Sequence, residues 1–258
     1  MEGYRMPVFS KGSLLSQEML ETLKNYELRI SENYFTGYAD GIIAGVDIKA
    51  SQGVVYIGKG LLRFHGRLFF IPENTRIAVH PNNEWQCVKA IFADFEKNDN
   101  FEKQEMKIEL SGNLQHEESA IEICRIRLQN GARLRCEYRG LEDMDTEYDT
   151  INLIESQWSA YGRESIHPAI LREFAREAKK YSLNHPMDVT FVMQLPADDG
   201  RAVNRELIQY YLESRLEKKE REYTNREIYQ GLCKALRLIK TGETQTMEKR
   251  KPRRLLVD

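Results

Sequence analysis

The sequence lacks the long apolar segments of a membrane protein and the leader of an exported one. No run of about 18 apolar residues occurs in the 258 residues, so no membrane-spanning helix is expected. The first five residues are not followed by an apolar signal core, so export is not expected either. The net charge of −2 disfavours a chain built to coat nucleic acid or an acidic membrane. We therefore expect a cytoplasmic protein.

Motifs for metal, nucleotide or hydrolytic chemistry are also missing. The four cysteines form no C-x-x-C pair, and the five histidines include no H-E-x-x-H arrangement. The stretch from Gly53 to Gly60 is close to a phosphate-binding loop, but Gly60 stands where a hydroxyl would bind Mg²⁺. No G-x-S-x-G nucleophile motif occurs. We therefore expect neither an enzyme nor a bound cofactor or metal.

Short apolar segments separated by glycines fill residues 38–79, and this pattern is typical of compact antiparallel β structure. It predicts strands over residues 42–48, 54–57, 61–64, 67–71 and 76–79. One of these strands carries the consecutive apolar residues Leu68, Phe69, Phe70 and Ile71. We expect it to lie centrally in a sheet or to be covered by another subunit.

Further strands are predicted downstream, with a polar loop over residues 94–104. They span residues 85–95, 106–110, 121–128 and 133–138. The last two flank Asn130-Gly131, which is the strongest short-range signal for a β-hairpin. Alternation gives this hairpin one apolar face and one cationic face, formed by Arg125, Arg127, Arg133 and Arg135.

Helical patterns lie at both ends of the chain. A helix is expected from Ser16, packed either on its own β domain or on a neighbouring subunit. After an acidic joint near residue 142, helices are expected over residues 146–161, 168–183, 202–222 and 225–241, with 188–195 as a strand or extended link. Thr224 and Glu227 form a capping box at the start of the last helix. A basic tail then carries Arg253, Arg254, Leu255 and Leu256.

The predicted class is α+β, with an N-terminal helix and an antiparallel β barrel or sandwich followed by a helical domain. The predicted parts are an N-terminal arm and helix (1–37), a β-rich domain (38–141), a helical domain (142–242) and a basic flexible tail (243–258).

The order of glycines and apolar residues over about residues 9–80 resembles tail and baseplate components of phages and of phage-derived contractile particles. The matching residues are Gly12, Leu15, Asp40, Gly41, Ile42, Ile43, Gly45, Val55, Ile57, Gly60, Gly66 and Arg67. This resemblance implies a subunit of a large assembly without an active site.

Two functional hypotheses follow. The first is a structural subunit of a phage-tail-like or contractile injection particle, most consistent with a baseplate position in a virion-like hetero-oligomer, with other tail or baseplate subunits as partners. The second is an accessory protein that binds nucleic acid through the arginine face and the basic tail. No aromatic stacking platform accompanies these arginines, which disfavours the second hypothesis, and the tail could meet either protein or nucleic acid.

Overall fold

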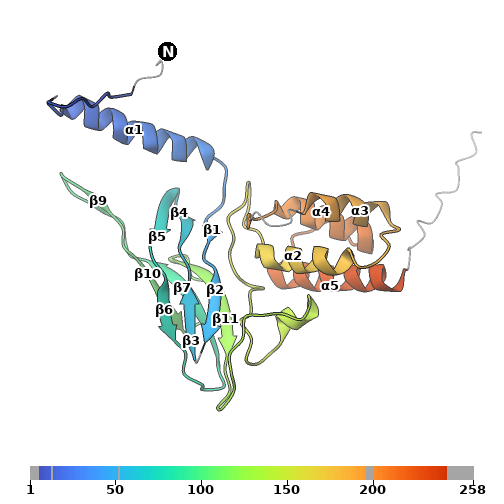
Figure 1. Cartoon of the computed structure of the whole chain (residues 1–258). Coiled ribbons are helices and arrows are strands. Elements are labelled where there is room, and N and C mark those ends of the chain that lie inside the picture. Colours follow the sequence, from blue (N-terminus) through green and yellow to red (C-terminus); the bar gives the residue numbers. More distant parts are fainter. Residues whose placement is uncertain (1–5, 13, 52, 196–199, 243–258) are drawn as a thin grey trace, which may run out of the picture.

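The computed structural model describes residues 6–12, 14–51, 53–195 and 200–242. Antiparallel sheets lie beside a group of C-terminal helices, and the N-terminal helix projects from the end of the sheets (Figure 1). The predicted α+β class is confirmed, and the sheets do not close into a barrel. Among the described residues, no helix is long and apolar enough to cross a membrane.

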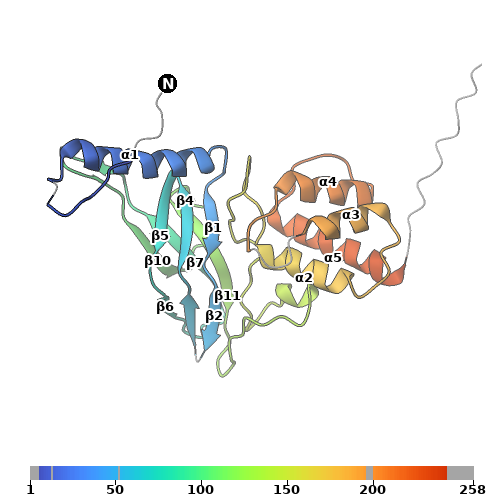
Figure 2. The same cartoon turned by 45° about the horizontal axis from the view of Figure 1, so that its top comes forward.

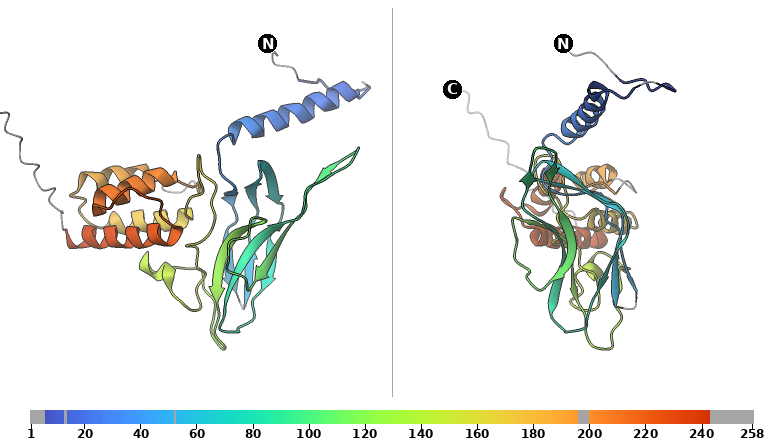
Figure 3. Two further views of the ribbon diagram at one scale, coloured as in Figure 1. Left: turned by 180° about the vertical axis from the view of Figure 1, so that it is seen from behind. Right: turned by 90° about the vertical axis from the view of Figure 1, so that its left-hand side faces the viewer.

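Helix α1 (Gln17–Tyr34) begins where the sequence predicts. The Ser16 hydroxyl accepts a hydrogen bond from the Met19 amide at 3.2 Å, and Glu18 lies in the first turn, where a negative charge is favourable. None of the α1 side chains that the structure describes is buried. The helix lies beyond the ends of the strands and apart from the C-terminal helices (Figures 1 and 3), and in Figure 2 it crosses the ends of the strands.

Two small sheets form the first half of the β region. One has the order β1-β4-β5, with β1 (Gly41–Gly45), β4 (Gly60–Phe64) and β5 (Arg67–Ile71); the other has the order β2-β3-β6, with β2 (Ile48–Ser51), β3 (Val54–Ile57) and β6 (Thr75–Ala78). The single strand predicted over residues 42–48 is wrong. Gly45 and Val46 have positive φ angles of 71° and 58°, so the chain turns there and passes from one sheet to the other.

The third sheet has the order β10-β7-β11 and packs against the first. Its strands are β7 (Trp85–Phe92), β10 (Met106–Ser111) and β11 (Ala120–Arg127). The Phe92 ring of β7 stacks on Phe64 of β4 with centroids 3.9 Å apart, so the two sheets share a core as in a sandwich. The predicted loop over 94–104 contains a small ribbon, β8 (Glu96–Lys97) and β9 (Glu102–Lys103), which extends away from the sheets (Figure 3).

The predicted hairpin between residues 121–128 and 133–138 is wrong, although its turn exists. Gly131 has a φ of 78°, and the Ala132 amide donates to the Gln129 carbonyl at 3.2 Å. The two flanking stretches do not pair, because an extended segment lies between them. The Asn152 amide donates to the Arg125 carbonyl at 2.8 Å, and the Ile151 amide donates to the Arg135 carbonyl at 3.0 Å.

That extended segment also replaces the helix predicted over residues 146–161. The apolar residues that form a helical stripe in the sequence are buried in an extended chain, where residues 150–154 are all buried in succession. An extended segment that is enclosed on both sides has no exposed face. The periodicity of apolar residues in the sequence cannot distinguish such a segment from a buried helix. We name residues 147–161 the inserted segment.

The C-terminal helices are α2 (Pro168–Ala178), α3 (Pro186–Gln194), α4 (Arg205–Leu216) and α5 (Asn225–Thr241). The predicted start of α2 at Pro168 is confirmed, and so is the capping box of α5 between Thr224 and Glu227. The strand or extended link expected over 188–195 is wrong, because Pro186 and the ring of His185, which accepts from the Met187 amide, start a helix there.

A short 3₁₀ helix, η1 (Glu142–Asp145), lies at the predicted domain boundary. It bonds to both parts of the chain: Arg135 contacts Asp143, and the Arg237 guanidinium of α5 lies 2.7 Å from the Glu142 carboxylate. The Tyr229 hydroxyl of α5 also donates to the Leu141 carbonyl at 2.7 Å. The division into four parts itself stays a prediction.

Candidate interaction surface

The segment that leads into α1, together with α1 itself, carries a series of exposed apolar side chains. Leu14 is 92% exposed and Val8 is 82% exposed, and the series further includes Phe9, Leu15, Leu20, Tyr26 and Tyr34. We name these residues the α1 surface. Several exposed large apolar side chains on one projecting element indicate an interaction site.

Strand β5 lies at the edge of its sheet. The expectation of a central position is therefore wrong, while cover by another subunit stays a prediction. Phe69 faces the core, with its ring 4.7 Å from that of Phe92, and Ile71 is buried. Phe70 points the other way and is 67% exposed, and Leu68 on the same face is half-buried. An exposed edge with a large aromatic side chain is open to pairing with another chain.

The turn that joins β4 to β5 is held in place by Asp40. His65 and Gly66 form a two-residue loop with φ angles of 46° and 79°, as in the tight turns that match the strand twist. The Asp40 carboxylate accepts from the His65 amide at 2.7 Å and from the Arg63 guanidinium at 2.9 Å. The position of the β5 edge is therefore fixed by residues outside the strand.

A groove runs between the C-terminal half of α1, strand β5 and the β8–β9 ribbon, and we name it the β5 groove. It encloses about 1340 Å³. Its apolar lining is formed by Phe35, Leu68, Phe69, Phe70 and Phe95. Its basic lining residues are Lys24, Arg63 and Arg67, and the Arg67 guanidinium lies 3.9 Å from the centroid of the Phe95 ring. The three candidate residues Leu68, Phe69 and Phe70 thus come together in one concave surface.

The four arginines predicted to form a cationic hairpin face are spread along different contacts. Arg125 bonds to Glu122 at 2.6 and 3.0 Å, Arg127 pairs with Glu147, and Arg135 bonds to Asp143 at 2.6 and 2.7 Å. Arg133 is exposed. Three of the four charges are therefore engaged within the chain, which weakens the nucleic-acid hypothesis. A role for these arginines at an interface stays a prediction.

The bidentate pair between Arg135 and Asp143 ties η1 to the β region. The hydrogen bonds from Arg135 lower the pKa of Asp143 well below its ordinary value of 3.8, although partial burial opposes this effect. The unfolded chain takes up a proton near the ordinary value, whereas the folded chain keeps the carboxylate ionised. The pair therefore contributes its full stability above the ordinary pKa and loses it as the pH falls through the folded pKa.

Replacing Asp143 by asparagine is expected to lower the free energy of unfolding more at pH 7 than at pH 2. At pH 2 the unfolded wild type protonates Asp143, and this proton uptake removes part of the stability that the pair contributes. Urea unfolding over that pH range measures this difference. Arg135→Gln should show the same pH dependence, whereas Arg133→Gln, next to the pair but exposed, should change little. An equal effect of Asp143→Asn at both pH values would contradict the assignment.

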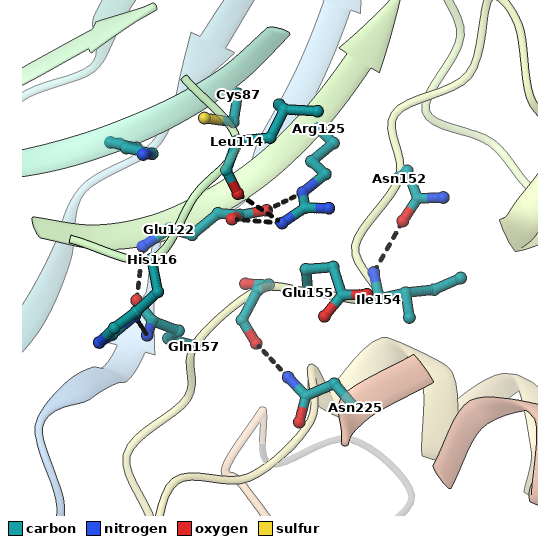
Figure 4. Close-up of polar contacts among 12 residues, drawn as sticks. Cys87, Leu114, His116, Glu122, Arg125, Asn152, Ile154, Glu155, Gln157 and Asn225 are labelled. Carbon is teal, nitrogen blue, oxygen red and sulfur yellow. Dashed lines mark hydrogen bonds and ion pairs between the residues drawn. The ribbon is translucent and has the colours of Figure 1, made fainter. Parts of the chain in front are cut away.

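A second, polar cleft of about 550 Å³ lies between β11, the loop over 112–120, the inserted segment and the start of α5. Figure 4 shows that the Glu122 and Arg125 side chains, which line this cleft, meet and that the Gln157 side chain lies beside that of His116. The Gln157 side chain accepts from the Glu122 amide at 2.7 Å and contacts the His116 ring at 3.3 Å. The Asn225 side chain donates to the Ser156 carbonyl at 3.3 Å.

Two ion pairs, Glu122 with Arg125 and Lys89 with Glu117, lie in the polar cleft. Burial raises the pKa of Glu122, and the hydrogen bond and charge of Arg125 oppose this rise. The Lys89 ammonium, which is buried, bonds to Glu117 at 2.8 Å and to the Gln115 carbonyl at 3.0 Å. Within the described ranges, no group of three His, Cys, Asp or Glu side chains could hold a metal ion. The contacts around the cleft connect the sheets, the inserted segment and the helices.

The remaining candidate residues, Arg253, Arg254, Leu255 and Leu256, lie outside the described residues. Their role at an interface stays a prediction.

No protein-family model matches the chain, and no curated protein matches it. Solved structures do show similarity over most of its length. The chain matches a protein in the baseplate subcomplex formed by TssK, TssF and TssG of the type VI secretion system, with a TM-score of 0.42 and 8% identity, over 94% of this chain and 100% of the other. These are baseplate proteins.

Two further structures are similar at the same level. TssK itself matches with a TM-score of 0.40 and 11% identity, over 95% of this chain and 70% of the other. A chain of the type VI secretion baseplate complex matches with a TM-score of 0.36 and 11% identity, over 92% of this chain and 100% of the other. TM-scores below 0.5 at such low identity do not establish a shared fold or function.

Sequence reasoning missed the polar cleft and the buried ion pair of the helical part. Asp188 and Arg215 are each 2% exposed and lie 3.0 Å apart, on α3 and α4. A carboxylate in the apolar stretch 188–195 was the one available signal, because a lone charge among apolar residues needs a partner when it is buried. The partner itself is 27 residues away and cannot be named from spacing.

Proposed function

We propose that the chain is a structural subunit of a phage-tail-like or contractile injection particle, located in its baseplate and acting through contacts with other protein subunits rather than by catalysis. The observation that carries the proposal is the α1 surface: a helix beyond the ends of the strands whose described side chains are all at least partly exposed. An isolated amphipathic helix is marginally stable, so its stability in the cell requires packing against a partner.

The class of assembly comes from the sequence. The resemblance over residues 9–80 to tail and baseplate components covers α1 and β5, where the exposed side chains of Leu20 and Phe70 lie. The polar cleft supports a structural role, because Lys89 pairs with Glu117, Arg125 pairs with Glu122, and Asn225 bonds to the Ser156 carbonyl within it. A particle subunit needs such rigid connections and several separate docking surfaces.

The test is incorporation of an α1 variant into particles. Leu15→Glu combined with Leu20→Glu is expected to reduce co-purification with particle proteins at least tenfold, because two charges replace apolar contacts at an interface. Both side chains are exposed, so the free energy of unfolding of the isolated protein should change by less than about 0.5 kcal/mol. Particles are purified from cells that carry the variant, and the subunit is quantified by mass spectrometry.

Asn25→Glu is the matched control, since it adds a charge to an exposed polar position of the same helix. It should leave incorporation unchanged. Normal incorporation of the double variant would remove α1 from the proposal, and a wild-type protein that is absent from every particle fraction would reject the proposed function as a whole.

A further inference from the structure

The β5 groove runs along the free edge of β5. Residues 65–70 all line it, although successive side chains of a strand point to opposite faces of a sheet. A groove that is lined by side chains from both faces of the sheet must therefore follow the edge of the strand. Within the described part of the chain, the backbone of β5 forms hydrogen bonds only with β4.

The turn geometry identifies the backbone groups that face the groove. In a hairpin with a two-residue loop, the pair next to the loop is a hydrogen-bonded pair, and bonded and non-bonded pairs then alternate. Phe64 and Arg67 form the first pair, so Arg67, Phe69 and Ile71 bond to β4. The amide and carbonyl groups of Leu68 and Phe70 consequently point outward. These groups can bond to one further strand.

The side chains around this edge favour a partner with apolar and acidic residues. Phe35 and Phe95 wall the groove, and Phe70 offers a 67% exposed ring along it. The lining includes three cationic side chains, Lys24, Arg63 and Arg67, of which Arg63 is paired with Asp40 at 2.9 Å. Its one carboxylate, Glu102, is paired with Lys97 at 2.6 Å. The volume of about 1340 Å³ exceeds the 300–1,000 Å³ that is usual for small-molecule pockets.

We propose that the β5 groove binds an extended segment of another protein, which adds to β5 as a fourth strand. Apolar side chains of this segment pack on Phe70 and Phe35, and at least one carboxylate meets Arg67. Main-chain hydrogen bonds to Leu68 and Phe70 provide affinity, and the alternate side chains provide specificity. The proposal rests on the proposed function only in taking the partner to be another subunit of the same particle.

The first test uses a displayed library of random 12-residue peptides, selected on the full-length protein. The expected binders are rich in Asp or Glu together with aromatic or aliphatic residues. Amide hydrogen exchange of Leu68 and Phe70 should slow at least tenfold when such a peptide binds, while Phe69, already bonded to β4, should change little. Binders without carboxylates, or unchanged exchange at Leu68 and Phe70, would overturn the proposal.

The second test separates the backbone contribution from the side chain. Phe70→Pro removes the outward amide donor, and proline is tolerated on the free side of an edge strand. Phe70→Ala removes the same ring and keeps the donor. The proline variant is expected to bind a selected peptide at least tenfold more weakly than the alanine variant. Equal binding by the two would reject strand addition.

The third test addresses charge and does not depend on the folding of the proline variant. Arg67→Glu should weaken peptide binding at least tenfold, and the loss should shrink at high salt because screening reduces charge interactions. Arg133→Glu, an exposed arginine far from the groove in sequence, is the control. Protection of Leu68 and Phe70 in the absence of peptide at raised protein concentration would instead assign the edge to a second copy of the chain and overturn the proposal.

The outcomes distinguish this inference from the proposed function. If the α1 double variant is lost from particles while no peptide protects β5, the inference fails and the structural role stands. If peptides bind as described but the protein is absent from particles, the groove is a docking site and the proposed function fails.

Discussion

Replacing Asp188 by alanine is expected to lower the free energy of unfolding by about 3–5 kcal/mol, since it removes one partner of a buried ion pair. The Asp188 carboxylate accepts from the Arg215 guanidinium at 3.0 and 3.1 Å and from the Tyr211 hydroxyl at 2.8 Å. Without it, the buried Arg215 guanidinium loses this ion pair between α3 and α4. Urea unfolding followed by circular dichroism measures the loss.

The double variant Asp188→Leu with Arg215→Leu is the informative control. It removes both charges and is expected to be much less destabilised than Asp188→Ala, because replacing both partners leaves no uncompensated charge. A double variant as unstable as the single one would mean that packing, rather than charge, sets the cost at this site.

Replacing Trp158 by alanine is expected to cost about 3–5 kcal/mol, the usual range when a large buried aromatic side chain is removed. Trp158 is 3% exposed and lies in the inserted segment, where its amide and carbonyl both bond to Ser165. Its ring meets that of His167, the N-cap of α2, with centroids 4.8 Å apart. The side chain therefore packs where the sheets meet the helices.

Tyr210→Ala is the matched comparison for Trp158→Ala, because this aromatic residue of α4 is 63% exposed. It should change the free energy of unfolding by less than about 0.5 kcal/mol. If the two variants were equally stable, the inserted segment would not contribute to the core in the way that its burial indicates.

Local signals in the sequence predicted many elements correctly. The glycine-bounded apolar runs gave β3 to β6, Pro168 gave the start of α2, and Thr224 with Glu227 gave that of α5. These features depend on residues a few positions apart. The helix predicted for the inserted segment was wrong because the conformation of this segment is set by partners such as Arg125 and Arg135, which lie on two other stretches of the chain.

The candidate surface was predictable only in part. The apolar run from Leu68 to Ile71 indicated a surface that needs cover, but the sequence did not show that β5 is an edge strand. The groove itself depends on the direction in which α1 leaves the fold and on the position of the β8–β9 ribbon, both of which are set by long-range packing. The predicted arginine face was wrong for a similar reason. The partner of Arg127 is Glu147, which lies 20 residues away and cannot be identified from local spacing.

The contacts of the inserted segment have a consequence for the order of events during synthesis. The Ala39 amide donates to the Ala160 carbonyl, and the Ser159 hydroxyl donates to the Ala39 carbonyl, across 120 residues of sequence. At about 5–20 residues per second, the ribosome needs roughly 6–24 s to reach these partners after residue 39 has been made. The edge of β1 stays uncovered throughout that interval, because its bonding partners lie at residues 157–160. A nascent chain stalled before residue 160 should therefore be a chaperone substrate, and one extended beyond it should not.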